Sequence, residues 1–197
     1  MPVNAQQLDS HLGAAPYDAT LRLFFALWPP SALRAKIAQH ALLWGFEPPE
    51  RSTVPDKLHL TVLFMDGVSK SHLQDVVGFG AKIACEAQRF TLQLDRAEIW
   101  AKGGIAHLAP SHLPGELTAL RVALARAAQK AGIPCDMRPF RPHVTLARGA
   151  QASLPPEGFA PILWHAADLC LVRSVLGTGA YALLARWTLP AASSSLS

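Results

Sequence analysis

Two short segments of the chain place a histidine and a threonine where both can reach the same ligand. The segments are His59-Leu60-Thr61-Val62 and His143-Val144-Thr145-Leu146. On a β-strand successive side chains alternate between the two faces. Each segment therefore predicts a strand that buries its apolar residues on one face and presents an imidazole and a hydroxyl on the other.

The repetition of this pattern carries more weight than either copy alone. Histidine and threonine each occur eight times in the 197 residues, and half of the residues are hydrophobic. At that usage, a string of histidine, apolar residue, threonine and apolar residue is expected about 0.1 times in a chain of this length. One copy alone would favour a satisfied polar pair in a sheet, whereas two copies on similar strands indicate a shared site.

Two histidines that face one cleft can divide the work of acid–base catalysis. A neutral imidazole accepts a proton from water and an imidazolium donates one to a leaving oxygen, and a pKa near 6.5 suits both steps. Each threonine lies about 7 Å along the strand from its histidine, close enough for both to contact one phosphate. The set meets the needs of phosphodiester hydrolysis without a metal.

A metal site is the main alternative use of two histidines. Zinc takes ligands from His, Cys, Asp and Glu, but none of these residues stands at ligand spacing beside His59 or His143, and threonine is a poor zinc ligand. We therefore predict neither a metal nor another cofactor.

The other six histidines have no partner motif, and we interpret them as surface or structural residues. Two of them fall on the solvent faces of predicted helices, and the rest lie near strand ends or in loops; they are His11, His40, His72, His107, His112 and His165.

The composition predicts one globular domain with a substantial core. Only 16% of the residues are charged, and no apolar run approaches the ~20 residues of a membrane helix. The first twenty residues lack the basic start and apolar run of a signal peptide, so we expect a cytoplasmic protein. The net charge of +4 favours phosphate-bearing partners only weakly.

Hydrophobic periodicity predicts strands and helices that alternate along the chain. Strands are expected at 21–27, 58–64, 90–100, 105–109, 143–147, 167–175 and 180–188, and helices after Ser31, Ser69 and Ser111. Met65-Asp66-Gly67 is expected to form a turn. We assign residues 1–20 to a disordered leader, 21–189 to a single domain and 190–197 to a disordered tail.

The chain resembles the two-histidine phosphoesterase superfamily. The nearer resemblance is to its bacterial and archaeal RNA 2′,3′-cyclic phosphodiesterases, historically named 2′-5′ RNA ligases. The resemblance covers roughly residues 21–188 and depends on four segments, RLFFALWP at 22–29, LHLTVLF at 58–64, FTLQLDRAEIW at 90–100 and PFRPHVTLAR at 139–148. It implies an α+β fold of two duplicated lobes, with antiparallel sheets that line a central cleft and helices on the outside.

The resemblance also implies roles for individual residues. His143 matches the general base that activates water, and His59 matches the acid that protonates the departing 3′ oxygen. Thr61, Thr145 and Arg148 match the phosphate-binding positions. Phe24 matches an aromatic position that could stack on the terminal base, a contact that tolerates any base. Strict strand alternation turns Arg148 away from His143 unless the strand ends or bulges near Ala147.

The implied activity is metal-independent hydrolysis of a terminal RNA 2′,3′-cyclic phosphate to a 2′-phosphate. Two alternatives stay open. The same site could cleave or reversibly join 2′-5′ linkages, or the protein could be a non-catalytic module that binds RNA ends. The expected partners are RNA 3′ ends or small cyclic-phosphate nucleotides, with no membrane, and we expect a monomer because one chain supplies both motifs.

Overall fold

The structure, a computed structural model, describes residues 20–46 and 52–191. It contains nine named strands in that part of the chain: β1 Thr20–Leu27, β2 Leu60–Ser69, β3 Phe90–Leu94, β4 Arg96–Trp100, β5 Ile105–Ala109, β6 Val144–Ala147, β7 Ile162–Ala166, β8 Asp168–Ser174 and β9 Tyr181–Thr188. The helices are α2 Ser31–Ala41, α3 Leu73–Glu86 and α4 Gly115–Lys130, with 3₁₀ turns at Leu42–Trp44, Pro55–Lys57 and Lys70–His72.

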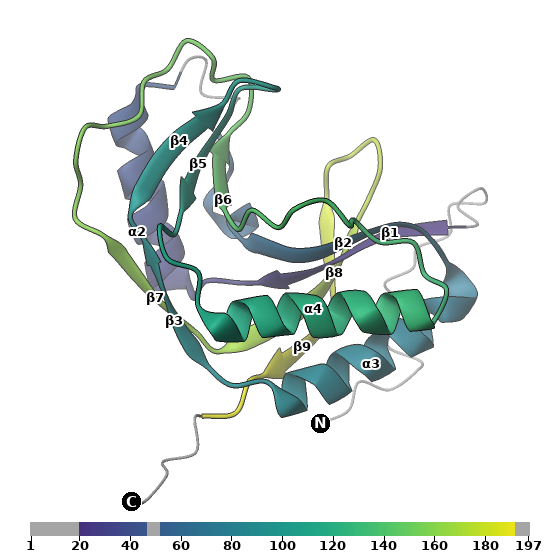
Figure 1. The fold of residues 1–197 in the computed structure, drawn as a ribbon. Helices are drawn as coiled ribbons and strands as arrows, with labels where there is room; N and C mark the ends of the chain where they lie inside the picture. Colours follow the sequence, from purple (N-terminus) through teal and green to yellow (C-terminus); the bar gives the residue numbers. More distant parts are fainter. Residues whose placement is uncertain (1–19, 47–51, 192–197) are drawn as a thin grey trace, which may run out of the picture.

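Seven of the strands form one strongly curved antiparallel sheet (Figure 1). Their order is β4-β5-β6-β2-β1-β8-β9, and β3 pairs with β7 in a separate ribbon. The sheet consists of two strand groups, β4-β5-β6 and β2-β1-β8-β9. They meet where β2 and β6 pair, with Leu60 opposite Val144. The two segments that carry the histidines and threonines are therefore neighbours at the centre of the sheet.

Strand β1 holds the larger group together because it is buried along most of its length. Leu23, Phe25 and Leu27 are fully buried in the main core, whereas Phe24 and Ala26 belong to a second, smaller apolar cluster on the opposite face. A strand covered on both faces reads as a continuous apolar run rather than as an alternating one. This is the reason for the sequence LRLFFAL.

Helices α3 and α4 lie side by side along the four-strand group, and α2 lies beside the three-strand group (Figure 1). Gly80 allows the close approach of α3, because a Cβ there would lie 2.7 Å from the Phe25 ring and 2.8 Å from that of Trp187. The helices thereby cover the core face of the sheet and leave its other face available for a site.

Several boundaries differ from the sequence prediction. The expected turn at residues 65–67 lies within β2, because a register shift opposite β1 absorbs the extra residues and Gly67 adopts a positive φ of 70°. The single strand expected at 90–100 divides at Asp95 into β3 and β4, which belong to different sheets. Strand β7 was not predicted. Helix α4 begins at Gly115 rather than at Ser111, whose backbone N–H and hydroxyl both donate to the Asp95 carboxylate.

The predicted α+β class is confirmed as a mixture of helices and antiparallel sheet. The predicted leader and tail lie almost wholly outside the described residues; Thr20 begins β1, and the Pro190 carbonyl accepts a hydrogen bond from the Arg89 backbone. Among the described residues, no helix combines the length and apolar character needed to cross a bilayer.

Candidate active site

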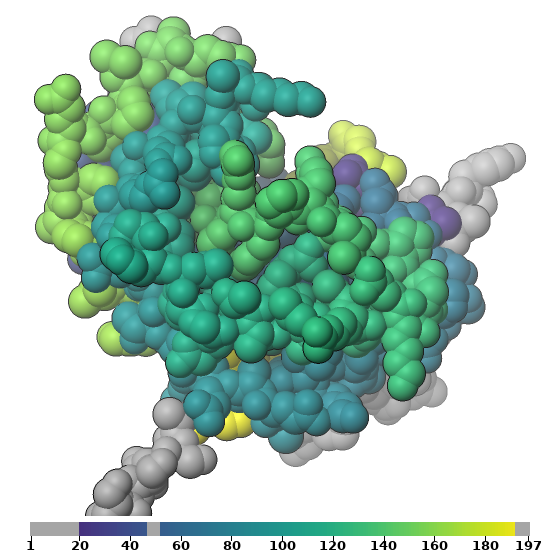
Figure 2. Space-filling model, in the orientation of Figure 1, coloured from purple at the N-terminus to yellow at the C-terminus, as the bar shows by residue number. Residues whose placement is uncertain are grey.

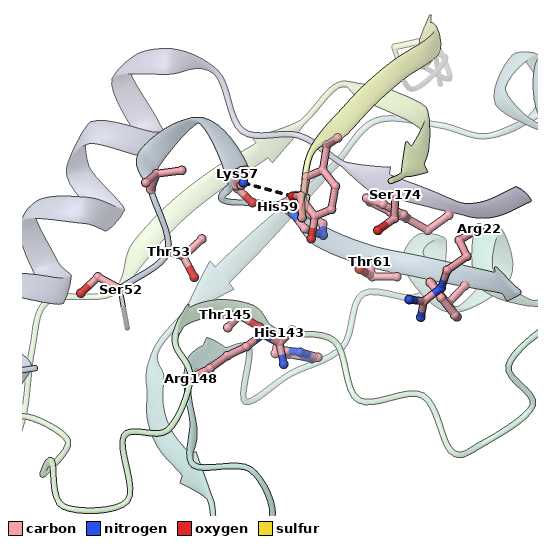
Figure 3. Close-up of a pocket in the computed structure, with 15 residues that line it drawn as sticks. Arg22, Ser52, Thr53, Lys57, His59, Thr61, His143, Thr145, Arg148 and Ser174 are labelled. Carbon is pink, nitrogen blue, oxygen red and sulfur yellow. Dashed lines mark hydrogen bonds between the residues drawn. The ribbon is translucent and has the colours of Figure 1, made fainter. Parts of the chain in front are cut away.

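A cleft of about 670 Å³ opens on the face of the sheet that the helices leave uncovered. Figure 2 shows a hollow between the β4–β5 end of the molecule and the loop that joins β8 to β9. Both strand groups contribute to the wall (Figure 3). The cleft is lined by Arg22, Phe24, Ser52, Thr53, Val54, Lys57, His59, Thr61, Phe64, His143, Thr145, Arg148, Ser174, Gly179 and Tyr181. Its volume is typical of a site for a small ligand.

The pairing of β2 with β6 brings the two predicted segments together in a diagonal arrangement. Leu60 lies opposite Val144 in an antiparallel register. When that register is extended by one residue in each direction, His59 comes beside Thr145, and Thr61 comes beside His143. Each histidine, which immediately precedes its strand, therefore has one threonine from that strand and another from the neighbouring strand, as the close-up in Figure 3 illustrates. The arrangement can hold one tetrahedral anion between two imidazoles.

The backbone fixes the tautomer of both imidazoles in the same way. Nδ1 of His59 lies 2.6 Å from the Lys57 carbonyl oxygen, and Nδ1 of His143 lies 2.8 Å from that of Arg141. A carbonyl oxygen can only accept, so Nδ1–H is the donor in each pair. In the neutral ring Nε2 then carries the lone pair and is the atom able to take a proton.

Burial lowers the pKa of both imidazoles. For His59 burial is the main cause of a fall from 6.5 to about 4; the bond to the Lys57 carbonyl opposes this fall, and the charges of His143 and Arg148 add to it. For His143 burial again dominates, and the charges of His107 and Arg148 act in the same direction. Arg148 therefore acts on both rings through its charge. With lowered pKa values, both imidazoles are neutral near pH 7 in the free protein.

Aromatic rings surround His59. Trp28 stacks on it at a centroid distance of 5.0 Å with the ring planes 10° apart. Phe24 and Tyr181 contact it at 5.1 and 5.5 Å. These rings exclude water from the imidazole, which explains the strong effect of burial on its pKa.

His143 has a more polar environment. Its ring lies 4.5 Å from the Trp100 ring and 5.5 Å from that of His107. His107 lies within β5, is 1% exposed, and was expected only as a surface or structural residue without a partner. A histidine between apolar residues in one strand of a predicted hairpin was the one sequence signal for it. His40, predicted on a solvent face of its helix, is also buried, against Phe159.

Arg148 reaches the cleft because β6 ends at Ala147. The backbone leaves the strand there, so the alternation that would turn Arg148 away no longer applies. Two further cations line the cleft. Arg22 forms an ion pair with Asp66 at 3.2 Å, and Lys57 donates to the Gly179 carbonyl at 3.1 Å. An excess of cations makes the cleft suitable for a phosphate group.

Phe24 lines the cleft but is only 3% exposed, with its ring against His59 and Tyr181. Tyr181, which the sequence reasoning missed, is 37% exposed and is the more accessible ring. Nothing in the local sequence singles it out, because β9 reaches the cleft only through its pairing with β8. In the part of the chain that the structure describes, no group of three or more His, Cys, Asp or Glu side chains could hold a metal ion.

Comparison with known proteins places this site in a family. The family model described as the 2′-5′ RNA ligase superfamily matches residues 29–174, and the chain belongs to that family. A protein of Escherichia coli (strain K12) named RNA 2′,3′-cyclic phosphodiesterase is 34% identical over 176 residues, which cover 85% of this chain and 96% of the relative. A protein of the same name from Thermus thermophilus is 28% identical and covers 79% of this chain and 83% of the relative.

Solved structures agree with this assignment. The crystal structure of a phosphoesterase superposes with a TM-score of 0.76 at 32% identity, over 87% of this chain and 99% of that one. E. coli LigT complexed with 3′-AMP gives a TM-score of 0.73 at 32% identity, over 86% of this chain and 98% of that one. Their coverage shows that the match extends over nearly the whole fold.

Proposed function

We propose that this protein hydrolyses terminal 2′,3′-cyclic phosphates of RNA to 2′-phosphates, without a metal, by acid–base catalysis between His59 and His143. The observation that carries the proposal is that both imidazoles line one cleft and that Nδ1 of each is bonded to a backbone carbonyl, which directs proton transfer to Nε2. The names of the E. coli and Thermus relatives support the same substrate.

The proposed reaction is a single in-line displacement at phosphorus. Nε2 of His143 removes a proton from water, and the water oxygen forms the new bond to phosphorus. The bond from phosphorus to the 3′ oxygen breaks, and protonated Nε2 of His59 gives its proton to that oxygen. The products are a 2′-phosphate and a 3′-hydroxyl, and one proton has moved in effect from His59 to His143.

The surroundings of the two rings support this division of roles. An imidazolium whose pKa is lowered by burial is a strong acid, which suits His59 as the donor to the leaving oxygen. The base must be unprotonated before the reaction, and the pKa of His143 is lowered by burial, with the charges of His107 and Arg148 acting in the same direction. The order also agrees with the roles that the family resemblance implies.

The threonines and Arg148 are proposed to bind the phosphate. The Thr61 and Thr145 hydroxyls can donate to the two non-bridging oxygens, and the guanidinium of Arg148 balances their charge as the transition state forms. The exposed ring of Tyr181, backed by Phe24, offers a stacking surface for the terminal base.

The experiment that tests this function is product analysis on a short RNA with a 2′,3′-cyclic phosphate end, in the presence of a chelator. The proposal expects complete conversion to the 2′-phosphate at a rate unchanged by EDTA. Exclusive formation of the 3′-phosphate, or loss of turnover with EDTA that returns with added metal, would overturn it.

The family description supports one other candidate, because it names 2′-5′ RNA ligation. Cleavage of a 2′-5′ linkage can use the same groups, and ligation is the reverse of a cleavage. Comparison of kcat/KM for a 2′-5′ dinucleotide with that for a cyclic-phosphate end separates these activities. A pure RNA-end binder would instead form no product and bind equally well after both histidines are replaced. Sedimentation at assay concentration tests the expected monomer.

A further inference from the structure

A third histidine lies directly behind His143. His107 is buried in β5 and pairs with Thr145 across β5 and β6. Its ring centroid is 5.5 Å from that of His143, with the planes 76° apart, and Trp100 contacts both rings at 4.4 and 4.5 Å. The three rings therefore contact one another, and the His143 imidazole packs against two rings from neighbouring strands.

Both nitrogens of His107 face hydrogen-bond acceptors. Nδ1–H donates to the Ile105 carbonyl at 3.0 Å, and Nε2 lies 3.8 Å from a carboxylate oxygen of Glu98. The other Glu98 oxygen pairs with Arg96. The neutral ring uses its one N–H at Nδ1, and Nε2 would carry a second N–H directed toward Glu98 only when the ring is protonated. The pKa of His107 lies below its usual 6.5, mainly because the ring is buried; the Ile105 carbonyl and Glu98 oppose this fall, and Arg96 adds to it.

Among the described residues, the arrangement has no match around the other imidazole. The rings in contact with His59 are those of Phe24, Trp28 and Tyr181, and none of them can carry a positive charge. A buried group able to hold a proton next to only one of two similar imidazoles distinguishes the two roles, which the symmetric motifs do not.

We propose that His107 is a positioning residue for His143: together with Trp100 it fixes the orientation of the His143 ring, so that the ring is held ready to accept a proton. The inference depends on the base role of His143 proposed above. A positive charge at this distance disfavours a second one on the neighbouring ring. The charged groups that act on the pair are Glu98 and Arg96 on His107, and Arg148 on His143.

The test is His107→Asn, which keeps a donor for the Ile105 carbonyl but never carries a charge. NMR titration of the histidine side chains gives the pKa of His143 directly, and a cyclic-phosphate RNA gives kcat/KM. We expect the pKa of His143 to rise by about 0.5 to 2 units. We expect kcat/KM to fall about 10-fold, because a misplaced proton-transfer group slows the reaction by up to ~10²-fold.

The matched control is His40→Asn, which also removes a buried histidine but lies on α2, away from the cleft. It should leave the pKa of His143 and kcat/KM unchanged. If His107→Asn does not fold, Glu98→Gln makes a second test at a partly exposed position. It should lower the pKa of His107 further and, because a proton is then held less readily on His107, raise the pKa of His143.

An unchanged pKa of His143 and unchanged kcat/KM in folded His107→Asn would overturn the inference, as would equal changes in the His40→Asn control. When His107→Asn has no effect but His143→Ala abolishes turnover in the same assay, only this inference fails and the proposed function stands. Full turnover in His143→Ala would instead remove the proposed function on which it depends.

Discussion

The two halves of the cleft hold their histidines in the same way but surround them differently. In both, Nδ1 donates to the carbonyl two residues earlier, and a threonine follows two residues later. His59 then meets a stacked Trp28, whereas His143 meets His107, with Glu98 behind that ring. We therefore propose that the repeated motif sets the geometry of proton transfer, and that the different neighbours of the two rings set which imidazole releases a proton and which accepts one.

The half of the cleft around His59, here called the aromatic half, contains the rings of Phe24, Trp28 and Tyr181. It also indicates how His59, with a pKa of about 4, can act as an acid. Bound phosphodiester adds a negative charge to the cleft and favours the imidazolium. The face of Trp28 attracts the protonated ring as well, because the indole face is electron-rich. In the proposed mechanism His59 is neutral in the free protein and takes up a proton when substrate binds.

The largest expected effect comes from removal of either imidazole. His59→Ala and His143→Ala should each lower kcat by about 10²–10⁴, since each removes one proton-transfer group. The double variant should be little worse than either single one, because groups that act as a unit are not additive. Circular dichroism confirms that the variants fold. Wild-type turnover in either one contradicts the paired mechanism.

The pH dependence should show that the two rings share one proton. Since burial lowers both pKa values below 6.5, the free protein loses that proton as the pH rises, and kcat/KM should fall about 10-fold per unit well above pH 6.5. The decline in kcat should begin at higher pH, because the bound anion raises both pKa values. Steady-state kinetics from pH 4.5 to 8.5 measures both. A flat kcat/KM between pH 5 and 8 is the contrary result.

The two threonines should contribute equally if one anion lies between the halves. Thr61→Val and Thr145→Val remove a hydroxyl with little change in shape. Each should lower kcat/KM about 10-fold, as expected for the loss of a hydrogen bond to a charged group. Parallel assays of both variants make the comparison. A strong effect from one and none from the other would mean that the phosphate binds in one half only.

The smallest expected effect on catalysis comes from the stacking surface in the aromatic half of the cleft. Tyr181→Leu should raise KM about fivefold for a cyclic-phosphate nucleotide, near the lower end of the range for loss of a stacked base, and leave kcat nearly unchanged. Phe24→Leu is the matched variant at a buried position and should act mainly on the free energy of unfolding. A larger change in KM from Phe24→Leu than from Tyr181→Leu would assign the stacking surface to Phe24.

Much of this site could be predicted from local sequence, because strand alternation is a local property. His59, Thr61, His143 and Thr145 were found in that way, and all four line the cleft. The position of Arg148 depended on where β6 ends, which alternation alone does not determine. His107 and Tyr181 enter through pairings between strands, β5 with β6 and β8 with β9, that no local pattern specifies.

The elements of the fold could likewise be predicted where they depend on local sequence, and not where they depend on pairing between strands. The long apolar runs of β1 and β8 predicted strands correctly. The bulge at Asp66-Gly67 was taken for a turn, because the same residue types favour both, and only the pairing with β1 distinguishes them. Strand β7 was missed because its five residues follow a loop rich in proline and glycine and are stabilised by β3.

The division of roles between the two halves is tested most directly by a change of the leaving atom. In a 2′,3′-cyclic phosphorothiolate the 3′ oxygen is replaced by sulfur, and a thiolate leaves without protonation. The account predicts that His59→Ala recovers most of the wild-type rate on this substrate, whereas His143→Ala stays inactive because water still needs a base. Recovery of His143→Ala with no recovery of His59→Ala would contradict it and exchange the two roles.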